Sequence, residues 1–227
     1  MTQTKRYRLG VAADVVVFTV DDGVLKVLLT RRDREPFEGE WSLPGGFVGD
    51  EESADRAAER ALKAKAGVAG VFLEQLYTFS APDRDPRSRV VAIAYYALVP
   101  RAVLPENGGS RESRWFGVGT LDDGRLWLGA REDPLRHLAF DHDLILLTAL
   151  TRIRGKLEYV PLGFQFLPEK FTLTDIQMVH EAILGHAVDK RNFRNKLLKS
   201  GLVAQLEEYR TGPHRPARLY QFTQQTF

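Results

Sequence analysis

The sequence predicts an α/β sandwich, with a mixed sheet between helices, followed by a small C-terminal winged helix-turn-helix domain. Several β-branched runs in the first 120 residues are separated by charged turns and one well-capped helical pattern. Beyond residue 157 the composition changes, and prolines and glycines mark a connector. Two short helical patterns and two strand-like runs then follow in the order of a winged helix. We therefore predict one domain over residues 1–157 and a second over residues 158–227.

The first domain begins with a predicted β-hairpin. Residues 11–20 and 24–30 are apolar runs on either side of an Asp-Asp-Gly turn. A later helix is expected over residues 144–153, with Asp141 as its cap candidate. Between the hairpin and this helix, further strand-like runs occur at 73–79, 90–99 and 114–118.

Another helix is expected over residues 53–66. Ser53 is among several N-cap candidates, and Gly67 suits the position just after a helix. Apolar residues at i, i+3 and i+4 spacing form its buried face, and most of them are small. We expect this face to approach the sheet closely; it consists of Ala54, Ala57, Ala58, Ala61 and Leu62.

This helix lies within a stretch, residues 46–68, that resembles the Nudix box of nucleoside-diphosphate hydrolases. The box runs Gly, five residues, Glu, seven residues, then Arg-Glu-apolar-x-Glu-Glu-x-Gly-apolar. The positions of its last three glutamates hold Ala61, Ala64 and Lys65. The positions that match are Gly46, Glu52, Arg60, Leu62, Gly67 and Val68.

In the Nudix family the box glutamates bind divalent cations, usually Mg²⁺, which clamp a diphosphate and activate water. Mg²⁺ requires oxygen ligands, and carboxylates supply them. We expect positions 61, 64 and 65 to share one helix face, which here has lost three negative charges and gained a lysine. Glu59 points about 200° away from Ala61 and does not replace it. We therefore predict no metal site, no cofactor and no catalytic residue, with hydrolysis lost or very weak.

Residue types that suit a diphosphate remain around the box. Arginine recognises phosphate in a bidentate manner, and paired glycines allow close approach of the backbone. Lys65 either supplies a point charge in place of the metal or has no role. The aromatic candidates either stack on a nucleobase or belong to the core. The candidate ligand-binding residues are Arg32, Arg34, Phe37, Trp41, Gly45, Gly46, Lys65, Phe79, Arg84, Arg87 and Arg89.

Positive charge is concentrated near the C-terminus. The chain carries a net charge of +2, but residues 182–227 hold eight Lys or Arg against three acidic residues. This imbalance suits a polyanionic partner, although a solvated basic face has the same composition.

The basic segment contains the predicted winged helix. A first helix opens at residues 172–177, where Thr174 and Gln177 have capping-box spacing. Asp189 caps a second helix over 190–200. The strand-like runs 202–206 and 217–222 form a ribbon, and 208–216 is its exposed tip.

The second helix of this motif has two chemically different faces. Phe193 and Leu197 form a buried stripe, while basic and amide side chains occupy the opposite side. Arginine and asparagine read guanine and adenine edges, and lysines and wing arginines contact the DNA backbone. The candidate DNA-binding residues are Thr172, Thr174, Lys190, Arg191, Asn192, Arg194, Asn195, Lys196, Arg215 and Arg218.

The whole chain resembles the Nudix-related transcriptional regulators of NAD metabolism, the NrtR family. The resemblance rests on short motifs at residues 41–46, 138–142, 154–159, 189–194 and 215–220, of which the last two together are specific. It implies a homodimeric repressor with an N-terminal sensor for ADP-ribose and a C-terminal DNA reader. Effector binding in that family releases the protein from palindromic operators near NAD-biosynthesis or salvage genes. A dimer also suits a palindromic operator physically, because two recognition helices read two half-sites.

Two other functions remain open. One is an ADP-ribose pyrophosphatase-like hydrolase that uses other carboxylates, such as Glu52 with Glu112 or Asp85. The other is a regulator that senses a pentose or a sugar phosphate. In either case the absence of cysteine, and of any apolar run of about 18 residues, predicts a cytoplasmic protein without a membrane partner.

Overall fold

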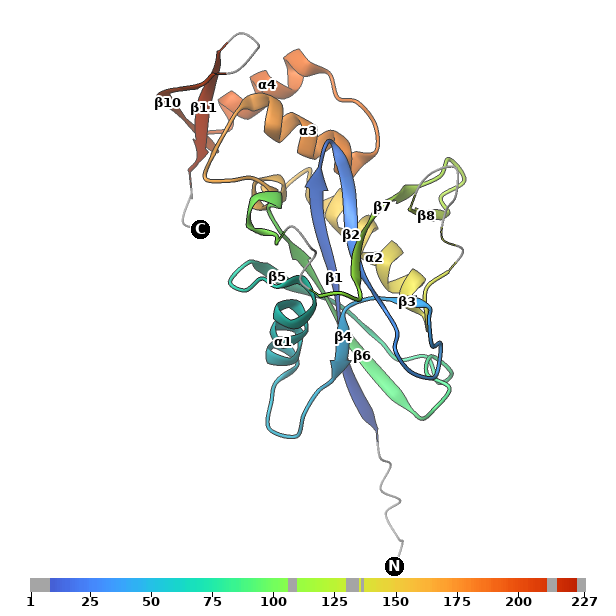
Figure 1. The fold of residues 1–227 in the computed structure, drawn as a ribbon. Helices are drawn as coiled ribbons and strands as arrows, with labels where there is room; N and C mark the ends of the chain where they lie inside the picture. Colours follow the sequence, from blue (N-terminus) through green and yellow to red (C-terminus); the bar gives the residue numbers. More distant parts are fainter. Residues whose placement is uncertain (1–8, 106–109, 130–134, 136, 212–215, 224–227) are drawn as a thin grey trace, which may run out of the picture.

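The computed structural model describes all of the 227 residues except 1–8, 106–109, 130–134, 136, 212–215 and 224–227. Its larger sheet has the strand order β5-β6-β1-β2-β7-β8, with β3 beside β2 and β4 beside β1 (Figure 1). The strands are β1 (Gly10–Asp21), β2 (Val24–Arg31), β3 (Trp41–Ser42), β4 (Gly45–Phe47), β5 (Phe72–Phe79), β6 (Val90–Leu98), β7 (Ser113–Thr120) and β8 (Leu126–Leu128). The predicted mixed sheet is confirmed, because β1 pairs parallel with β6 and antiparallel with β2.

Strand β1 lies at the centre of this sheet and is buried on both faces. Ala13, Val15 and Val17 pack in one core cluster with helix α1 (Ala54–Ala66). Val16 and Phe18 point the other way and pack with helix α2 (His142–Lys156). Strands covered on both faces have near-continuous apolar sequences, which explains the long β-branched run.

The hairpin and the first helix form as their local sequences predict. Asp22 and Gly23, between β1 and β2, have φ angles of 50° and 72°, as a type I′ turn requires. Ser53 caps α1 by accepting a hydrogen bond from the Arg56 backbone N–H, and Gly67 ends the helix at φ 72°. The expected helix at 144–153 is also present, as the longer α2.

Asp141 precedes α2 but does not cap it. It occupies the N-cap position, yet its side chain makes no hydrogen bond to the helix backbone. The carboxylate instead accepts two hydrogen bonds from Arg84. The predicted cap is therefore wrong, since a tertiary ion pair takes its place.

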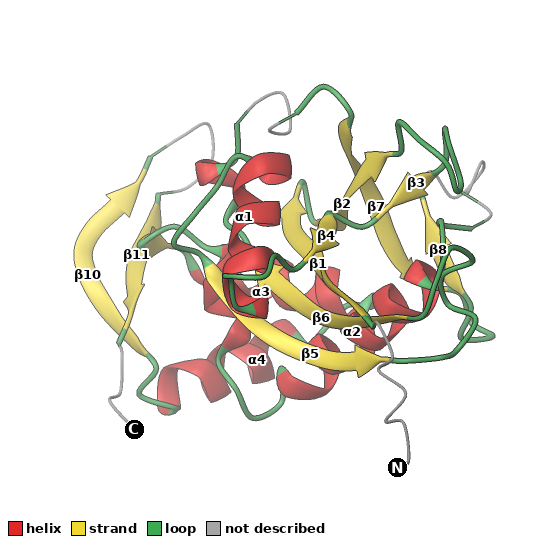
Figure 2. Cartoon of the chain, turned by 90° about the horizontal axis from the view of Figure 1, so that it is seen from below, coloured by secondary structure: helices red, strands yellow, loops and turns green. Residues whose placement is uncertain are grey.

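The C-terminal region is a winged helix with one more strand than expected. The sheet of the winged helix has the order β10-β11-β9, and its short strand β9 was not predicted. A 3₁₀ turn, η2 (Leu162–Phe166), comes just before β9 in the chain. Another 3₁₀ turn, η1 (Arg101–Val103), follows β6 of the larger sheet. In the view of Figure 2, β10 and β11 lie at one end of the molecule, away from β3 and β8. The elements are β9 (Lys170–Phe171), α3 (Leu173–Leu184), α4 (Lys190–Lys199), β10 (Val203–Arg210) and β11 (Ala217–Phe222).

Two local predictions in this region are wrong. The capping box of α3 joins Thr172 to Asp175, not Thr174 to Gln177. Strand β10 continues to Arg210, so residues 208–210 belong to the sheet and not to an exposed tip. The first correction is local, because the helix cap lies two residues earlier than predicted, whereas the second depends on pairing of β10 with β11. The remainder of the predicted tip falls mostly on residues 212–215, outside the described residues.

The helix α3 packs into both parts of the chain. Val179 and Ile183 belong to the same core cluster as α2, whereas Ile176 belongs to the cluster of the winged helix. The proposed boundary after residue 157 thus stays a prediction, because packing is continuous across it. Among the described residues, no helix has both the length and the apolar character that crossing a membrane requires.

A half-buried arginine joins three elements at this junction. The Nε of Arg154 in α2 donates to the Ile183 carbonyl at 2.8 Å, and its Nη1 donates to the Thr120 Oγ1 at 2.9 Å. Ile183 lies in the last turn of α3, whose carbonyls lack helical partners and favour a cation. Arg154 therefore fixes the winged helix against β7 and α2.

We expect Arg154→Met to destabilise the protein by about 2 kcal/mol, because both charged hydrogen bonds are lost and a carbonyl is left without its donor. Urea unfolding followed by circular dichroism measures this. The matched variant Arg125→Met removes a 77% exposed side chain from a surface ion pair and changes stability by less than about 0.5 kcal/mol. Equal stability of the two variants contradicts the assigned role of Arg154.

Candidate ligand pocket and nucleic-acid interface

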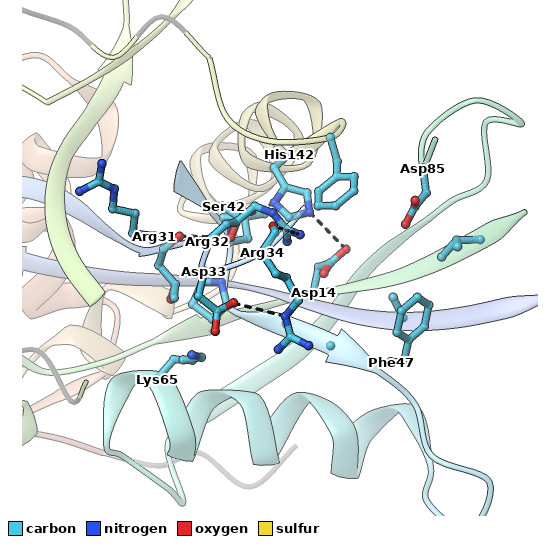
Figure 3. A pocket seen from close by; sticks show the side chains of 18 of the residues that line it. Asp14, Arg31, Arg32, Asp33, Arg34, Ser42, Phe47, Lys65, Asp85 and His142 are labelled. Atoms are coloured by element: carbon cyan, nitrogen blue, oxygen red, sulfur yellow. Dashed lines mark hydrogen bonds and ion pairs between the residues drawn. The ribbon is translucent and has the colours of Figure 1, made fainter. Parts of the chain in front are cut away.

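A pocket of about 550 Å³ opens between β1, β4, the segment after β2, the loop before β6 and the start of α2. Its lining is mostly polar, and Figure 3 shows side chains from these elements pointing into one space. The volume lies in the range of small-molecule sites.

Seven of the eleven predicted ligand-binding residues line this pocket: Arg32, Arg34, Gly45, Gly46, Lys65, Arg84 and Arg87. The other four do not. Phe79 is buried in the main core, and Trp41 packs edge-on against Phe116 at 4.8 Å. Phe37 packs behind the pocket residue Phe140 at 4.9 Å, and Arg89 donates to the Ala81 carbonyl. Residue type alone therefore selected the arginines and glycines better than the aromatic residues.

Gly45 is required by the close approach of two strands. It pairs with Asp14 across β4 and β1. A Cβ at this position would lie 2.8 Å from the Ala13 carbonyl oxygen and would also overlap the Asp14 carboxylate. Only glycine lets β4 lie this close to the bottom of the pocket.

The deepest part of the pocket contains a buried charge cluster of Asp14, Arg84, Asp141 and His142. Arg84 binds Asp141 through two hydrogen bonds of 2.9 and 2.6 Å, and its Nη2 lies 3.5 Å from the Asp14 Oδ2. One guanidinium thus faces two carboxylates. Burial raises the pKa of Asp14 to about 6, against the opposing effect of Arg84.

His142 is a neutral member of this cluster. The Leu43 backbone N–H donates to its Nδ1 at 2.9 Å, so the ring proton lies on Nε2, 3.7 Å from the Asp14 Oδ2. Burial lowers the pKa of His142 to about 3. The contact with Asp14 is consequently not an ion pair near neutral pH. Sequence reasoning missed both residues, although a carboxylate inside the apolar run of β1 is a visible signal.

Cations form one side of the pocket, here called the cationic wall: Arg31, Arg32, Arg34 and Lys65. Arg32 is held by a 2.7 Å hydrogen bond from its Nε to the Pro36 carbonyl. Lys65 extends from α1 toward the same space (Figure 3). Burial, together with the positive charges of Arg87 and Arg34, lowers the pKa of Arg32. An anion on this wall would relieve the repulsion.

Two rings and one guanidinium form the aromatic rim of the pocket: Phe47, Phe140 and Arg87. The Arg87 Cζ lies 5.6 Å from each ring centroid, and Arg87 is held by Asp85 at 2.7 Å. Arg32 lies 4.7 Å above the Phe140 ring. Phe47 is 50% exposed, so its ring is available to stack on a planar ligand group.

The box helix does not fit a Mg²⁺ ion. Ala61 is buried, Ala64 is exposed, and of these three box positions only Lys65 lines the pocket. Glu52 is occupied by Arg60 at 2.5 Å, which lowers the pKa of its carboxyl. In the part of the chain that the structure describes, no three His, Asp or Glu side chains gather as a metal site would need.

The second candidate site is the outer face of α4. Phe193 and Leu197 pack inward with Phe171 and Tyr220. As predicted, basic and amide side chains remain on the outside, namely Lys190, Arg191, Asn192, Asn195 and Lys196.

The five other predicted DNA-binding residues are not part of this exposed face as the structure describes it. Thr172 is buried and closes the capping box of α3, so its hydroxyl is not free for DNA. Thr174 is exposed but accepts a 2.9 Å hydrogen bond from Arg194, which therefore joins α4 to α3. Arg218 donates to the Tyr209 hydroxyl across the wing strands. Arg215 lies outside the described residues.

Ion pairs join strand β10 of the wing to helix α3 and to strand β9. Arg210 in β10 binds Asp175 at the start of α3 at 2.9 Å, and Lys170 binds Glu208 at 2.7 Å.

The fold and the two sites define a Nudix-type domain with an anion-binding pocket, joined to a winged helix with a basic outer helix. The NUDIX domain model matches residues 8–136, and the model of the NrtR DNA-binding winged helix domain matches residues 163–222. The chain belongs to the NrtR family of Nudix-domain proteins.

Individual relatives agree with this assignment. The ADPR responsive transcriptional repressor NtrR of Acinetobacter baylyi is 35% identical over 218 residues, which cover 94% of this chain and 82% of that protein. Shewanella oneidensis NrtR complexed with a 27mer DNA matches with a TM-score of 0.79 and 32% identity, over 94% of this chain and 93% of that one. Its NUDIX domain complexed with ADP ribose matches with a TM-score of 0.52 and 32% identity, over 65% and 90%.

We expect the pH dependence of stability to reveal the neutral His142. The pKa of His142 is lower in the folded state than the ordinary 6.5. Its contribution to the free energy of unfolding is therefore fully present above pH 6.5 and is lost as the pH falls toward 3. Between pH 7 and pH 5 the wild type should lose about 2 kcal/mol more than His142→Gln, which keeps an acceptor for Leu43.

Urea titrations at the two pH values measure this difference. Asp14, whose folded pKa is raised, acts in the opposite direction only below about pH 6, and it is present in both proteins. The variant His186→Gln changes an exposed ring outside the cluster and should follow the wild type. If His142→Gln also follows the wild type, His142 is not buried in its neutral form.

Proposed function

We propose that this chain is a DNA-binding transcriptional repressor whose Nudix domain senses ADP-ribose, or a related nucleotide sugar, without hydrolysing it. The observation that carries the proposal is Lys65. An ammonium stands in a nucleotide-sized pocket where an active Nudix helix presents a carboxylate to its metal. The relatives' names, an ADPR responsive repressor and NrtR structures with DNA and with ADP ribose, support the same function.

The pocket suits a diphosphate flanked by two other groups. The cationic wall supplies arginine forks and one lysine for phosphate oxygens. The aromatic rim offers the exposed Phe47 ring to a base. A ligand with a base, a diphosphate and a sugar therefore matches the lining better than a free pentose, which carries no negative charge for the cationic wall.

Hydrolysis by this family requires a water activated through a metal, and no group of three His, Asp or Glu side chains among the described residues could hold one. The carboxylates suggested as substitutes are mostly paired already: Glu52 with Arg60 and Asp85 with Arg87. Glu112 also lines the pocket, but the other two candidates, Glu52 and Asp85, are paired with arginines and do not join it as metal ligands. The structure thus disfavours the hydrolase alternative.

We expect the purified protein, incubated with ADP-ribose and Mg²⁺, to release no AMP above the protein-free rate. Chromatography of the nucleotides measures this, with an active ADP-ribose hydrolase as the positive control. Sustained turnover that scales with protein concentration contradicts the non-hydrolytic sensor. Isothermal titration with ADP-ribose, ribose phosphates and arabinose then identifies the effector class, and binding of a pentose alone supports the second alternative.

DNA recognition is assigned to α4, with a homodimer placing two such helices on a palindromic operator near NAD-biosynthesis or salvage genes. The exposed Arg191 and Asn192 at its N-terminal end have the donor groups that read base edges. Release by the effector requires that ADP-ribose bind the free dimer more tightly than the DNA-bound one.

The double variant Arg191→Ala, Asn192→Ala should weaken binding to a duplex selected by the wild type by about 100-fold or more, because each base contact contributes about 1–3 kcal/mol. Fluorescence anisotropy at fixed salt measures this. Arg125→Ala, which removes an exposed cation from the Nudix domain, is the matched control and should bind normally. Unchanged affinity of the double variant places recognition on another surface.

A further inference from the structure

Asp14 is a polar exception on an apolar face of the central strand. In β1 the residues on the α2 side alternate with those on the α1 side, and Val16 and Phe18 on the α2 side belong to the core. Asp14 stands on this same side, only 6% exposed, and lines the bottom of the pocket. Figure 3 shows its carboxylate below His142, on the side of the ligand space.

The structure gives this carboxylate little compensation for its burial. Asp141 takes both strong hydrogen bonds from Arg84, and Asp14 keeps only a 3.5 Å contact with that guanidinium. His142 Nε2 lies 3.7 Å away, beyond normal hydrogen-bond length. The other charged side chains lining the same pocket are Arg31, Arg32, Asp33, Arg34, Lys65, Asp85, Arg87 and Glu112, and no hydrogen bond or ion pair joins any of them to Asp14. Burying an incompletely paired charge costs stability, so a functional reason for Asp14 is needed.

The charges of the pocket also set the orientation of a ligand. The cationic wall attracts phosphate, whereas the buried charge cluster carries two carboxylates and one guanidinium and repels it. A group that reaches Asp14 must therefore be neutral or positive, and must donate hydrogen bonds. The adjacent hydroxyl groups of a pentose satisfy both conditions.

We propose that Asp14 is the specificity-determining residue of the pocket, accepting hydrogen bonds from hydroxyl groups of the terminal pentose of a nucleoside diphosphate sugar. This inference rests on the proposed function, since it assumes that a diphosphate occupies the cationic wall. The base then lies at the aromatic rim, and the terminal sugar lies at the bottom of the pocket. A nucleoside diphosphate without the terminal pentose would offer Asp14 no hydroxyl group as a hydrogen-bond donor.

Isothermal titration of the full-length protein with ADP-ribose and with ADP tests this assignment. Hydrogen bonds to a buried carboxylate are strong, so Asp14→Asn should weaken ADP-ribose binding about 10- to 100-fold. Binding of ADP should change by less than about threefold, because its phosphates and base do not reach Asp14. The matched control is Asp21→Asn, which removes a carboxylate from the same strand outside the pocket, where Asp21 pairs with Lys26.

Each outcome decides the matter. If Asp14→Asn weakens ADP and ADP-ribose equally, Asp14 binds the adenine or orients Arg84, and the sugar assignment is overturned. If neither affinity changes, the assignment is overturned as well. If the wild type binds neither ligand, the proposed effector class itself fails, which is a distinct result. Thermal unfolding checks that Asp14→Asn is folded. If it is not, Asp14→Ser is used for the same comparison of ADP-ribose and ADP.

Discussion

The structure depends on one constraint: β1 must be buried on both faces while three strands pair with it. Its N-terminal half pairs with β4 and β6, and its C-terminal half pairs with β2 and β6. Helices α1 and α2 then cover opposite faces through alternate residues of the same strand. Because the β4 backbone lies so close to β1, position 45 must be glycine. The backbone that encloses the pocket is thus held in place by strands of the core. The ligand site is therefore built on the central strand, which is buried on both faces.

Helix α2 connects this site to the DNA reader. At its first turn Asp141 and His142 belong to the buried charge cluster, and in its last turn Arg154 binds the end of α3. The helix has 15 residues, a length of about 22 Å, and α3 continues into the winged-helix core through Ile176. A ligand that changes how Arg84 is shared between Asp14 and Asp141 acts directly on the start of α2. These contacts connect the pocket, through α2, to the end of α3 in the winged helix.

The sequence predicted the elements whose causes are local. The hairpin turn, the caps of α1 and the long strands depend on nearby residues, and they form as expected. The two- and three-residue strands β3, β4, β8 and β9 depend on distant partners, and were missed. The site divides similarly: arginines were found by chemical type, but His142 meets Leu43 across 99 positions of sequence. Whether an aromatic ring faces the pocket, as Phe140 does, or the core, as Phe79 does, is likewise decided by tertiary packing.

The surviving part of the Nudix box has a physical explanation that separates shape from catalysis. Glu52 accepts hydrogen bonds from the Gly49 N–H and from Arg60, and Arg60 also donates to the Phe47 carbonyl at 3.0 Å. These matching positions hold the loop against α1, and they place Phe47 at the rim and Gly46 in the lining. The positions that differ from the box are those whose carboxylates serve a metal. A chain that uses the pocket for binding alone needs the positions that hold the loop, such as Glu52 and Arg60. It does not need the carboxylates that bind the metal. Under the proposed function, Lys65 supplies positive charge in place of the metal and leaves water unactivated.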